Sequence, residues 1–503
     1  MKPHLECTIF RVRVAALGVL LLASSACFAQ LYSVTDLGTL GGTTSSANGI
    51  NASGQVVGAA AISGSSSPSH AFRTAANSPI NPATDDLVPP GPCTSDDFGN
   101  GRCIFDAIAN GINNSGQAVG WMDTCCATDV RAFHTAPNGP ITLPDDFIGN
   151  DGPQAYGINR SGEVVGFDVF TFHAFRTAAN YSSSNPVMYD LGTLAPGGVN
   201  SYGAGSTHAY GINDSGQVVG SSDIGNNAPY PGASHAFRTA ANRAINPATD
   251  DLGTLGGSSS IASHINLFGQ AAGMSYTPAD TAGHAFRTAP NRPINPATDD
   301  LGTLGGSSSY AKGIDDYGQV VGWAYTTGDT AQHAFLYSSG VIRDLNNLIP
   351  AGSGCELIGA ADINDTGQIA ANGNCGGQGH AVLLNPVYKA FVRPPINADG
   401  SSVFKARRGV LPVKFRLTQY GVRTCTLPPA TIAITRAAGA TLASVNESIY
   451  VTPAHSGSNF GIDPTACQYI YHLDARSLGP GAYLVDLSID GVMVGHAVFA
   501  LQK

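Results

Sequence analysis

Short apolar stretches alternate with glycine, asparagine and serine along most of the chain, and one such stretch returns at regular intervals. The motif Gly-Ile-Asn-x-x-Gly-Gln-Val-Val-Gly, or a variant of it, recurs with its Ile at positions 50, 112, 158, 212, 265, 314 and 363. Consecutive copies are 62, 46, 54, 53, 49 and 49 residues apart. A period of this length predicts a fold in which one small unit is repeated seven times.

Two further motifs accompany the first. A His-Ala-Phe motif or a variant of it follows every copy, beginning at His70, Arg131, His173, His235, His284, His333 and His380. An Asp-Leu-Gly-Thr-Leu motif precedes most copies, beginning at Asp36, Asp190, Asp251 and Asp300, with shortened forms at Asp86 and Asp344. The third copy has Thr142-Leu143-Pro144 in that place. Each copy therefore offers four short β-prone stretches separated by turn residues.

The linker between two of these stretches predicts a tight hairpin. In the first copy it reads Asn51-Ala52-Ser53-Gly54, where Asn can bond the turn backbone and Gly can adopt a positive φ. Four strands in roughly 50 residues, repeated seven times, predict a closed seven-bladed β-propeller over residues 30–386. An open β-solenoid is the alternative, although its strands pair with neighbouring repeats and its repeats are usually shorter.

The three recurring motifs together resemble the HAF family of extracellular repeats, which is named after His-Ala-Phe. The resemblance covers residues 33–384 and implies an exported bacterial protein without an agreed activity. Three copies depart from the pattern: copy two has Arg131 for His, copy three lacks Asp-Leu-Gly, and copy seven has Val382 for Phe. We expect distortion in those three blades.

After Pro386 the repeats end, and residues 387–503 read as alternating strands of a second domain. The clearest are residues 411–417, 431–435, 469–473 and 483–489. About 115 residues of this pattern predict a small immunoglobulin-like β-sandwich. The Pro412-x-Lys414-Phe415 motif is similar to the PxKF domain of exported bacterial proteins, which implies an accessory domain without catalytic residues. The predicted fold class is therefore all-β.

The first 29 residues predict an export signal. Basic residues precede an apolar run over residues 14–23, and small residues allow cleavage after Ala29. Lipidation of Cys27 is the alternative, but Ser24 stands where a lipoprotein signal has Leu. We expect a secreted protein, in the extracellular space, on the cell surface or in the periplasm.

Composition agrees with an exported β protein. Only 12% of residues are charged, while 62 Gly and 30 Pro favour a turn-rich chain. After the leader, no apolar stretch approaches the roughly 20 residues of a membrane helix. Residues 30–386 hold 11 Lys/Arg and 28 Asp/Glu, a net charge of −17, which disfavours nucleic acid as a partner. Residues 387–503 hold 11 and 6, a net charge of +5.

Eight cysteines remain after the leader, an even number that predicts disulfides in an oxidising compartment. Metal binding is disfavoured because no Cys-x-x-Cys occurs. We expect one bridge between Cys355 and Cys375 and another between Cys425 and Cys467. Four more cysteines in copy two can pair in three ways: Cys93, Cys103, Cys125 and Cys126.

The recurrent histidine is the most obvious candidate for chemistry. It occurs in six copies, as His70, His173, His235, His284, His333 and His380. A catalytic residue is normally needed once, so we interpret these histidines as structural groups that bond the backbone or the Asp of Asp-Leu-Gly. No residue is assigned to catalysis, cofactor binding or metal binding on the sequence alone.

Two other patterns have both a chemical and a structural interpretation. Glycosylation sequons occur at Asn51, Asn113, Asn159, Asn213 and Asn364, but each lies in the predicted hairpin turn. Acid pairs occur at residues 96–97, 145–146, 250–251 and 299–300. They could hold calcium, but none forms a spaced calcium loop, so a turn role is favoured.

Strong enzyme signatures such as Gly-x-Ser-x-Gly and His-Glu-x-x-His are absent from the sequence. The sequence therefore favours a non-catalytic binding or scaffold protein, without a cofactor, whose partner is an extracellular glycan or protein. One alternative is a polysaccharide enzyme with two carboxyls roughly 5–10 Å apart at the channel mouth. A surface adhesin is the other alternative.

Overall fold

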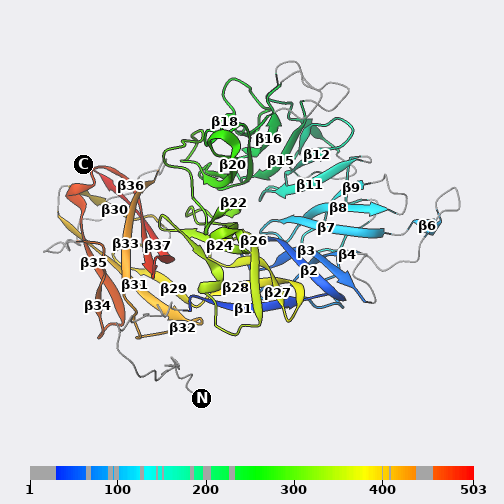
Figure 1. Ribbon diagram of the computed structural model, residues 1–503. Coiled ribbons are helices and arrows are strands. Elements are labelled where there is room, and N and C mark those ends of the chain that lie inside the picture. Colours follow the sequence, from blue (N-terminus) through cyan, green and yellow to red (C-terminus); the bar gives the residue numbers. More distant parts are fainter. Residues whose placement is uncertain are drawn as a thin grey trace, which may run out of the picture.

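The fold is seen in a computed structural model (Figure 1). The described residues are 30–63, 69–88, 94–95, 101–102, 104–124, 130–142, 145–149, 152–179, 181, 186–195, 205–225, 233–398, 400–406, 409–437 and 457–502. The expected leader and the four cysteines of copy two lie outside them. Strands account for 55% of the structure and helices for 3%, which confirms the all-β prediction. Within the described residues, no helix has the length and apolar character needed to cross a membrane.

Each repeat folds into its own small antiparallel sheet, which begins at the strand that carries Gly-Ile. The first four sheets are β2 (Gly41–Ile50), β3 (Val56–Ile62) and β4 (Ser69–Arg73); β7 (Ile104–Ile112), β8 (Ala118–Thr124), β9 (Val130–His134) and β10 (Phe147–Ile148); β11 (Pro153–Ile158), β12 (Val164–Asp168), β13 (Ala174–Thr177) and β14 (Met188–Asp190); and β15 (Thr207–Ile212), β16 (Val218–Asp223), β17 (Ser234–Arg238) and β18 (Asp251–Gly253).

The last three sheets follow the same order, with one exception in the final sheet. They are β19 (Ser260–Ile265), β20 (Ala271–Tyr276) and β21 (Gly283–Arg287); β22 (Gly305–Ile314), β23 (Val320–Thr326), β24 (Gln332–Ser338) and β25 (Val341–Asp344); and β26 (Cys355–Ile363), β27 (Ile369–Cys375) and β28 (Gln378–Pro386) with β1 (Tyr32–Gly38). The exception is that β1, from the opposite end of the repeat region, supplies the fourth strand of the final sheet. Figure 1 shows this blue strand beside the yellow strands of the last repeat.

The Asp-Leu-Gly segment thus belongs to the sheet of the preceding copy. Asp36 lies opposite Val382 in the pairing of β1 with β28, just as Asp190 lies opposite Phe175 in the pairing of β14 with β13. In sheets one and five this fourth segment is reduced to single bridges, which join Phe72 to Asp86 and Phe286 to Asp300. Each repeat therefore depends on the next one for its outer strand.

The hairpin turns form as the sequence predicts. Asn51 Oδ1 accepts hydrogen bonds from the backbone N–H groups of Ser53 and Gln55, and Gly54 has a φ of +81°. A second glycine in the motif is required by close packing. A Cβ on Gly58 would lie 1.9 Å from the backbone oxygen of Ser46, so no larger residue fits there without a shift of the backbone.

The apolar side chains fill the space between adjacent sheets. In one such layer Ala272, Ala285 and Leu301 from sheet five pack with Ala311 and Phe335 from sheet six. Another layer joins the final sheet to the first, through Leu383 and Phe72 among others. Each sheet contacts the next in chain order, and the last contacts the first.

All three irregular copies form four-stranded sheets. Copy seven accommodates Val382 because this side chain, like the usual Phe, is fully buried. In copy two the fourth strand is β10, and Phe147 pairs with Phe133 at the position where Asp stands elsewhere. The prediction that Thr142-Leu143-Pro144 replaces Asp-Leu-Gly was therefore wrong, because the strand begins a few residues later. Copy three, the sheet of β11–β14, also has four strands.

Residues after Pro386 form two further sheets, and the four strands that the sequence predicts there are confirmed. One contains β29 (Tyr388–Arg393), β31 (Val410–Gln419), β32 (Val422–Arg423), β34 (Gly461–Asp463) and β35 (Gln468–Asp474). The other contains β30 (Val403–Lys405), β33 (Ala430–Ala437), β36 (Gly481–Ile489) and β37 (Val492–Gln502). The short remaining elements are β5 (Thr94–Ser95), β6 (Gly101–Arg102), and the 3-10 helices η1 (Pro278–Asp280), η2 (Thr327–Asp329), η3 (Leu345–Asn347) and η5 (Ala475–Ser477).

The C-terminal sheets pack directly against the repeats. Their buried residues form one apolar cluster with those of the last two repeat sheets, including Leu336, Leu345 and Phe404. Polar contacts add to this interface: the Ser339 and Ser488 hydroxyls lie 3.0 Å apart. The rings of Tyr317 and His496 also meet there, with centroids 3.7 Å apart.

Candidate functional site

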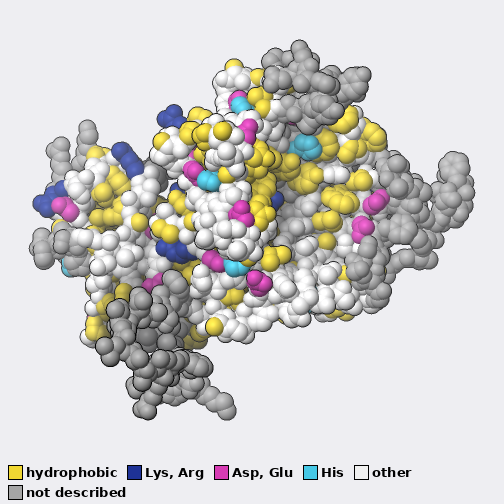
Figure 2. Space-filling model, in the orientation of Figure 1, with side chains coloured by type: hydrophobic (Ala, Val, Ile, Leu, Met, Phe, Trp, Pro, Cys, Tyr) yellow, Lys and Arg dark blue, Asp and Glu magenta, His cyan; other side chains and the backbone are white. Residues whose placement is uncertain are grey.

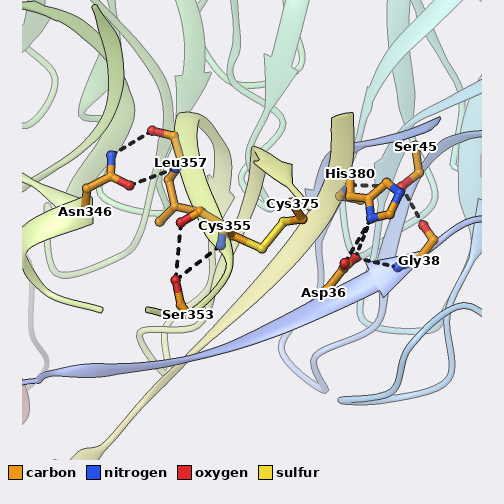
Figure 3. The surroundings of a disulfide bond; sticks show 10 residues. Asp36, Gly38, Ser45, Asn346, Ser353, Cys355, Leu357, Cys375 and His380 are labelled. Carbon is orange, nitrogen blue, oxygen red and sulfur yellow. Dashed lines mark hydrogen bonds and ion pairs between the residues drawn. A yellow bond between two sulfur atoms is a disulfide. The ribbon is translucent and has the colours of Figure 1, made fainter. Parts of the chain in front are cut away.

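All six recurrent histidines hydrogen-bond an aspartate through Nδ1. The pairs are His70–Asp86, His173–Asp190, His235–Asp251, His284–Asp300, His333–Asp344 and His380–Asp36, with distances of 2.6–2.9 Å. Each pair joins the third strand of a sheet to its fourth segment, and Figure 3 shows the pair that holds β1 on the final sheet. Burial acts to raise the pKa of Asp251, but hydrogen bonds from His235 and the Gly253 backbone outweigh it and lower the pKa.

Copy two replaces this ion pair with a different contact. Arg131 stands in the place of the histidine, and its guanidinium lies 5.0 Å from the centroid of the Phe147 ring. Phe147 stands in the place of the aspartate. Both members of the pair have changed together, so a cation–π contact joins β9 to β10 where a His–Asp bond joins the strands elsewhere.

The turn asparagines link neighbouring sheets. Asn51 Nδ2 donates to the backbone oxygen of Asn113, the equivalent residue of the next copy, over 3.2 Å. Equivalent bonds run from Asn113 to Asn159, Asn159 to Asn213, Asn213 to Asn266, Asn266 to Asp315 and Asn364 to Asn51, over 2.8–3.3 Å. The five sequon asparagines are buried in these bonds, which explains their recurrence without glycosylation.

Asp315 is the exception in this series. Its Oδ1 accepts from the backbone N–H groups of Tyr317 and Gln319, as in the other turns, but its Oδ2 is buried without a hydrogen-bond partner. Burial raises the pKa of Asp315 well above its usual value, and the nearby charges of Asp365 and Asp316 raise it further. A carboxylate cannot donate a hydrogen bond, so the link from sheet six to sheet seven lacks the donor found in the other copies.

In two of the acid pairs that the structure describes, the first acid bonds the backbone of a turn and the second lies in the fourth segment of a sheet. In the pair at residues 250–251, Asp250 Oδ2 accepts from the Asn246 backbone N–H over 2.8 Å, and Asp251 bonds the histidine. The pair at 299–300 repeats this arrangement, and Asp146 accepts from the Thr142 backbone. Asp96 and Asp97 lie outside the described residues.

Two of the predicted disulfides are present. Cys355 and Cys375 join β26 to β27 at positions that face each other in the register (Figure 3). Cys425 and Cys467 are bridged in the C-terminal part. Asp36 lies near the Cys355–Cys375 disulfide. The two sulfurs of this disulfide are bonded to each other, so they are not thiolate ligands for a metal.

A cavity of about 610 Å³ is lined by residues from the first strands of all seven sheets. Each of these strands carries a β-bulge at one residue, which directly precedes the Gly of Gly-Ile or the residue that replaces this Gly. A bulge turns the side chain of the bulged residue away from the regular pleat of the strand. The seven bulge residues are Asn48, Asn110, Tyr156, Tyr210, Ser263, Lys312 and Ala361. All seven line the cavity.

Aromatic rings form one part of the cavity wall. Tyr156 and Tyr210 lie with ring centroids 5.5 Å apart, and Tyr310 and Trp323 lie 6.2 Å apart in an edge-on arrangement. Burial raises the pKa of Tyr210 to about 12, so this hydroxyl stays protonated at neutral pH. The wall thus combines apolar ring surface with hydroxyl groups that can donate hydrogen bonds.

Amide side chains complete another part of the wall. Asn48 Nδ2 donates to the backbone oxygen of Ala109, and Asn110 Nδ2 donates to that of Ala155, each over about 3 Å. Within the described residues, the Oδ1 atoms of Asn48 and Asn110 make no hydrogen bond, which leaves two acceptors available at the wall.

Two residues of the cavity wall also face the turn asparagines. His264 and Asp362 stand where the other five copies have Gly, and both also line an adjoining hollow of about 200 Å³. Asp362 is held by the backbone, since its Oδ2 accepts from Ile50 N–H and its Oδ1 from Ile363 N–H. Burial raises the pKa of Asp362, and the nearby His264 opposes this shift.

One pair of acids in the adjoining hollow, Asp316 and Asp365, lies too close together for glycoside hydrolysis by a spaced pair. Burial and the neighbouring charge of Asp365 raise the pKa of Asp316 to about 6, and the two side chains share a hydrogen bond. The carboxyls of Asp316 and Asp365 are in direct contact, whereas the two catalytic carboxyls of glycosidases lie roughly 5 Å or more apart.

Neither a family model nor a curated protein sequence matches this chain. The cavity residues were not among the sequence candidates, which were the recurrent residues. A usable signal was present: all seven copies have Ala two residues before the Gly of Gly-Ile or its replacement, whereas the residue between varies between Asn, Tyr, Ser, Lys and Ala.

Proposed function

We propose that this chain is an exported bacterial binding protein, without catalytic activity, that takes a glycan in its central cavity. The observation that carries the proposal is the cavity wall, where Tyr156, Tyr210, Tyr310 and Trp323 stand beside amide and hydroxyl groups. A cavity of a few hundred Å³ with apolar surface and a few placed polar groups is the usual form of a small-ligand site. The apolar face of a sugar ring packs on an aromatic ring, while its hydroxyls bond the polar groups.

The architecture that we propose is a seven-bladed β-propeller of the HAF type, followed by an immunoglobulin-like accessory domain of the PxKF type. The pairing of β1 with β28 supports the propeller, since it joins the two ends of the repeat region in one sheet. The asparagine bond from Asn364 back to Asn51 supports it as well. The two disulfides fit an oxidising, extracellular location.

The polysaccharide enzyme is the less favoured alternative. Among the described residues that line the main cavity, Asp362 is the one carboxylate, and both of its oxygens already accept backbone hydrogen bonds. An acid held in this way is poorly placed to protonate a glycosidic oxygen.

The test is a glycan-array screen of the mature protein together with an assay for released reducing sugar. We expect binding without release, and we expect Tyr156→Ala and Tyr210→Ala to weaken binding. A matched control is Tyr276→Ala, which removes an exposed tyrosine that does not line the cavity. Release of sugar that is abolished by Asp362→Asn would contradict the proposal.

A further inference from the structure

Lys312 is the only lysine between Gln30 and Pro386, and it is one of the seven bulge residues that line the cavity. In this acidic part of the chain, exposed cations are scarce. Figure 2 shows Lys and Arg side chains gathered mainly over the C-terminal sheets, while acidic side chains spread over the repeats. A lone lysine within the cavity is therefore unlike the ordinary solvated lysine of a protein surface.

The Lys312 ammonium has no anionic partner in the described part of the chain. Its Nζ lies 4.1 Å from the centroid of the Tyr310 ring, and no carboxylate forms an ion pair with it there. The side chain stays accessible because it faces the cavity, yet the surrounding protein lowers its pKa by desolvation. A bound anion would stabilise the charged form of this amine.

We propose that the cavity binds an acidic glycan, and that Lys312 pairs with a carboxylate of a uronic acid residue. This inference rests on the proposed glycan-binding function. Tyr310 and Trp323 offer ring surface next to the ammonium, so one sugar residue can contact both kinds of group. The two Oδ1 acceptors of Asn48 and Asn110, which make no hydrogen bond within the described residues, suit sugar hydroxyls at another part of the wall.

The net charge of −17 over residues 30–386 opposes an anionic ligand at long range. Salt screens exposed charges beyond about 8–10 Å at physiological ionic strength, whereas contacts inside a cavity are screened much less. The local ammonium therefore decides the preference. Charge-assisted hydrogen bonds of this kind are about twice as strong as neutral ones.

The experiment compares two probes with the same sugar backbone: trigalacturonate, which is charged, and its methyl ester, which is neutral. Binding to the mature protein is followed by calorimetry and by tryptophan fluorescence, since Trp323 lines the cavity. We expect trigalacturonate to bind at least about tenfold more tightly than the ester. We expect Lys312→Gln to abolish this difference by weakening the binding of trigalacturonate, and Lys312→Arg to retain most of the difference.

The matched control is Lys389→Gln. Lys389 is also exposed and lies near an aromatic ring, with Nζ 5.8 Å from the centroid of Phe391, but it belongs to the C-terminal part. Equal loss of trigalacturonate binding in both lysine variants would overturn the inference in favour of general attraction to cations. Equal affinity for both probes in the unaltered protein would overturn it while leaving the proposed function intact. If neither probe nor any arrayed glycan binds, both proposals fail.

Discussion

At the scale of single residues, the turn asparagines show why one side-chain type recurs at equivalent positions. Asn51 accepts two backbone hydrogen bonds within its own turn and donates from Nδ2 to the next copy. An amide provides both an acceptor and two donors, whereas an aspartate of nearly the same shape provides acceptors only. The interaction between copies therefore requires Asn, although the turn itself would accept Asp.

Asp315 tests this reasoning because it is the one aspartate in the series. We predict that Asp315→Asn raises the free energy of unfolding at pH 7 by about 1–3 kcal/mol, the usual penalty of an unsatisfied buried polar group. The pKa of Asp315 is raised in the folded state, so the native protein binds more protons than the unfolded one above pH 4. The stability that protonated Asp315 contributes at low pH is therefore lost as pH rises towards its pKa in the folded state. The gain in stability from Asp315→Asn grows over the same pH range.

Urea unfolding at pH 4 and pH 7 measures this effect, and Asn266→Asp is the matched control. Asn266 Nδ2 donates to the Gln270 side chain and to the Asp315 backbone oxygen, so its replacement removes two bonds of the same kind in the neighbouring sheet. We expect this control to lose stability as pH rises. An Asp315→Asn variant with unchanged stability at both pH values would mean that the donor is not needed.

The sequence predicted the local half of these contacts only. The Asn-x-x-Gly spacing is enough to predict the bonds within one turn, because all the atoms lie within four residues. The donation to the next copy joins residues 46–62 positions apart, or 313 for Asn364 and Asn51, and only the packing of the sheets brings them together. The same limit applies to the recurrent histidines. The sequence predicted that each bonds either the backbone or the Asp of Asp-Leu-Gly, and it could not decide between the two.

At the scale of strands, one His–Asp pair joins the third strand to the fourth segment in six of the sheets. In copy two a contact between Arg131 and Phe147 connects the same two strands, so both partners differ from those in the other copies. We predict that Arg131→His and Phe147→Asp each destabilise the protein, while the double variant recovers about 0.5–1 kcal/mol relative to the sum of the single effects. The physical reason is that His and Asp restore a pair that the other sheets use, whereas each single change leaves a mismatched partner.

A double-mutant cycle by urea unfolding gives this coupling energy. The matched control exchanges the pair of the next sheet in the opposite direction, with His173→Arg and Asp190→Phe. We expect a coupling of the same sign there. Additive single effects at both places would indicate that the two sites changed independently.

The bulges explain why the fold was easier to predict than the candidate site. Recurrent Gly, Val and Phe positions carry the packing of each sheet, and recurrence made them visible in the sequence. The bulge residues differ from copy to copy and face the cavity, so they do not recur as the packing positions do. A bulge also interrupts the two-residue period of a strand, so the alternation of apolar and polar residues gives no indication that Tyr156 and Lys312 share a wall.

At the scale of the whole molecule, the pairing of β1 with β28 makes the repeats depend on one another. Tyr32 and Leu37 of β1 are almost fully buried, although they lie about 350 residues away from their partners in the chain. We predict that deletion of residues 30–38 lowers the free energy of unfolding by about 5 kcal/mol or more, since several large apolar side chains lose their burial. Urea unfolding of the shortened and the mature protein measures this loss.

The location of the loss distinguishes a closed arrangement from an open one. Every sheet contacts two neighbours, and the first contacts the last, so loosening the final sheet should also expose the first. In the shortened protein we therefore expect hydrogen-exchange protection to fall in β2–β4 as well as in β26–β28. A synthetic peptide of residues 30–38 should restore protection in both, whereas the same peptide with Leu37→Asp should not, because Leu37 is buried between these sheets. Loss confined to β26–β28 would instead indicate a linear stack, in which an end repeat frays without weakening the first repeat.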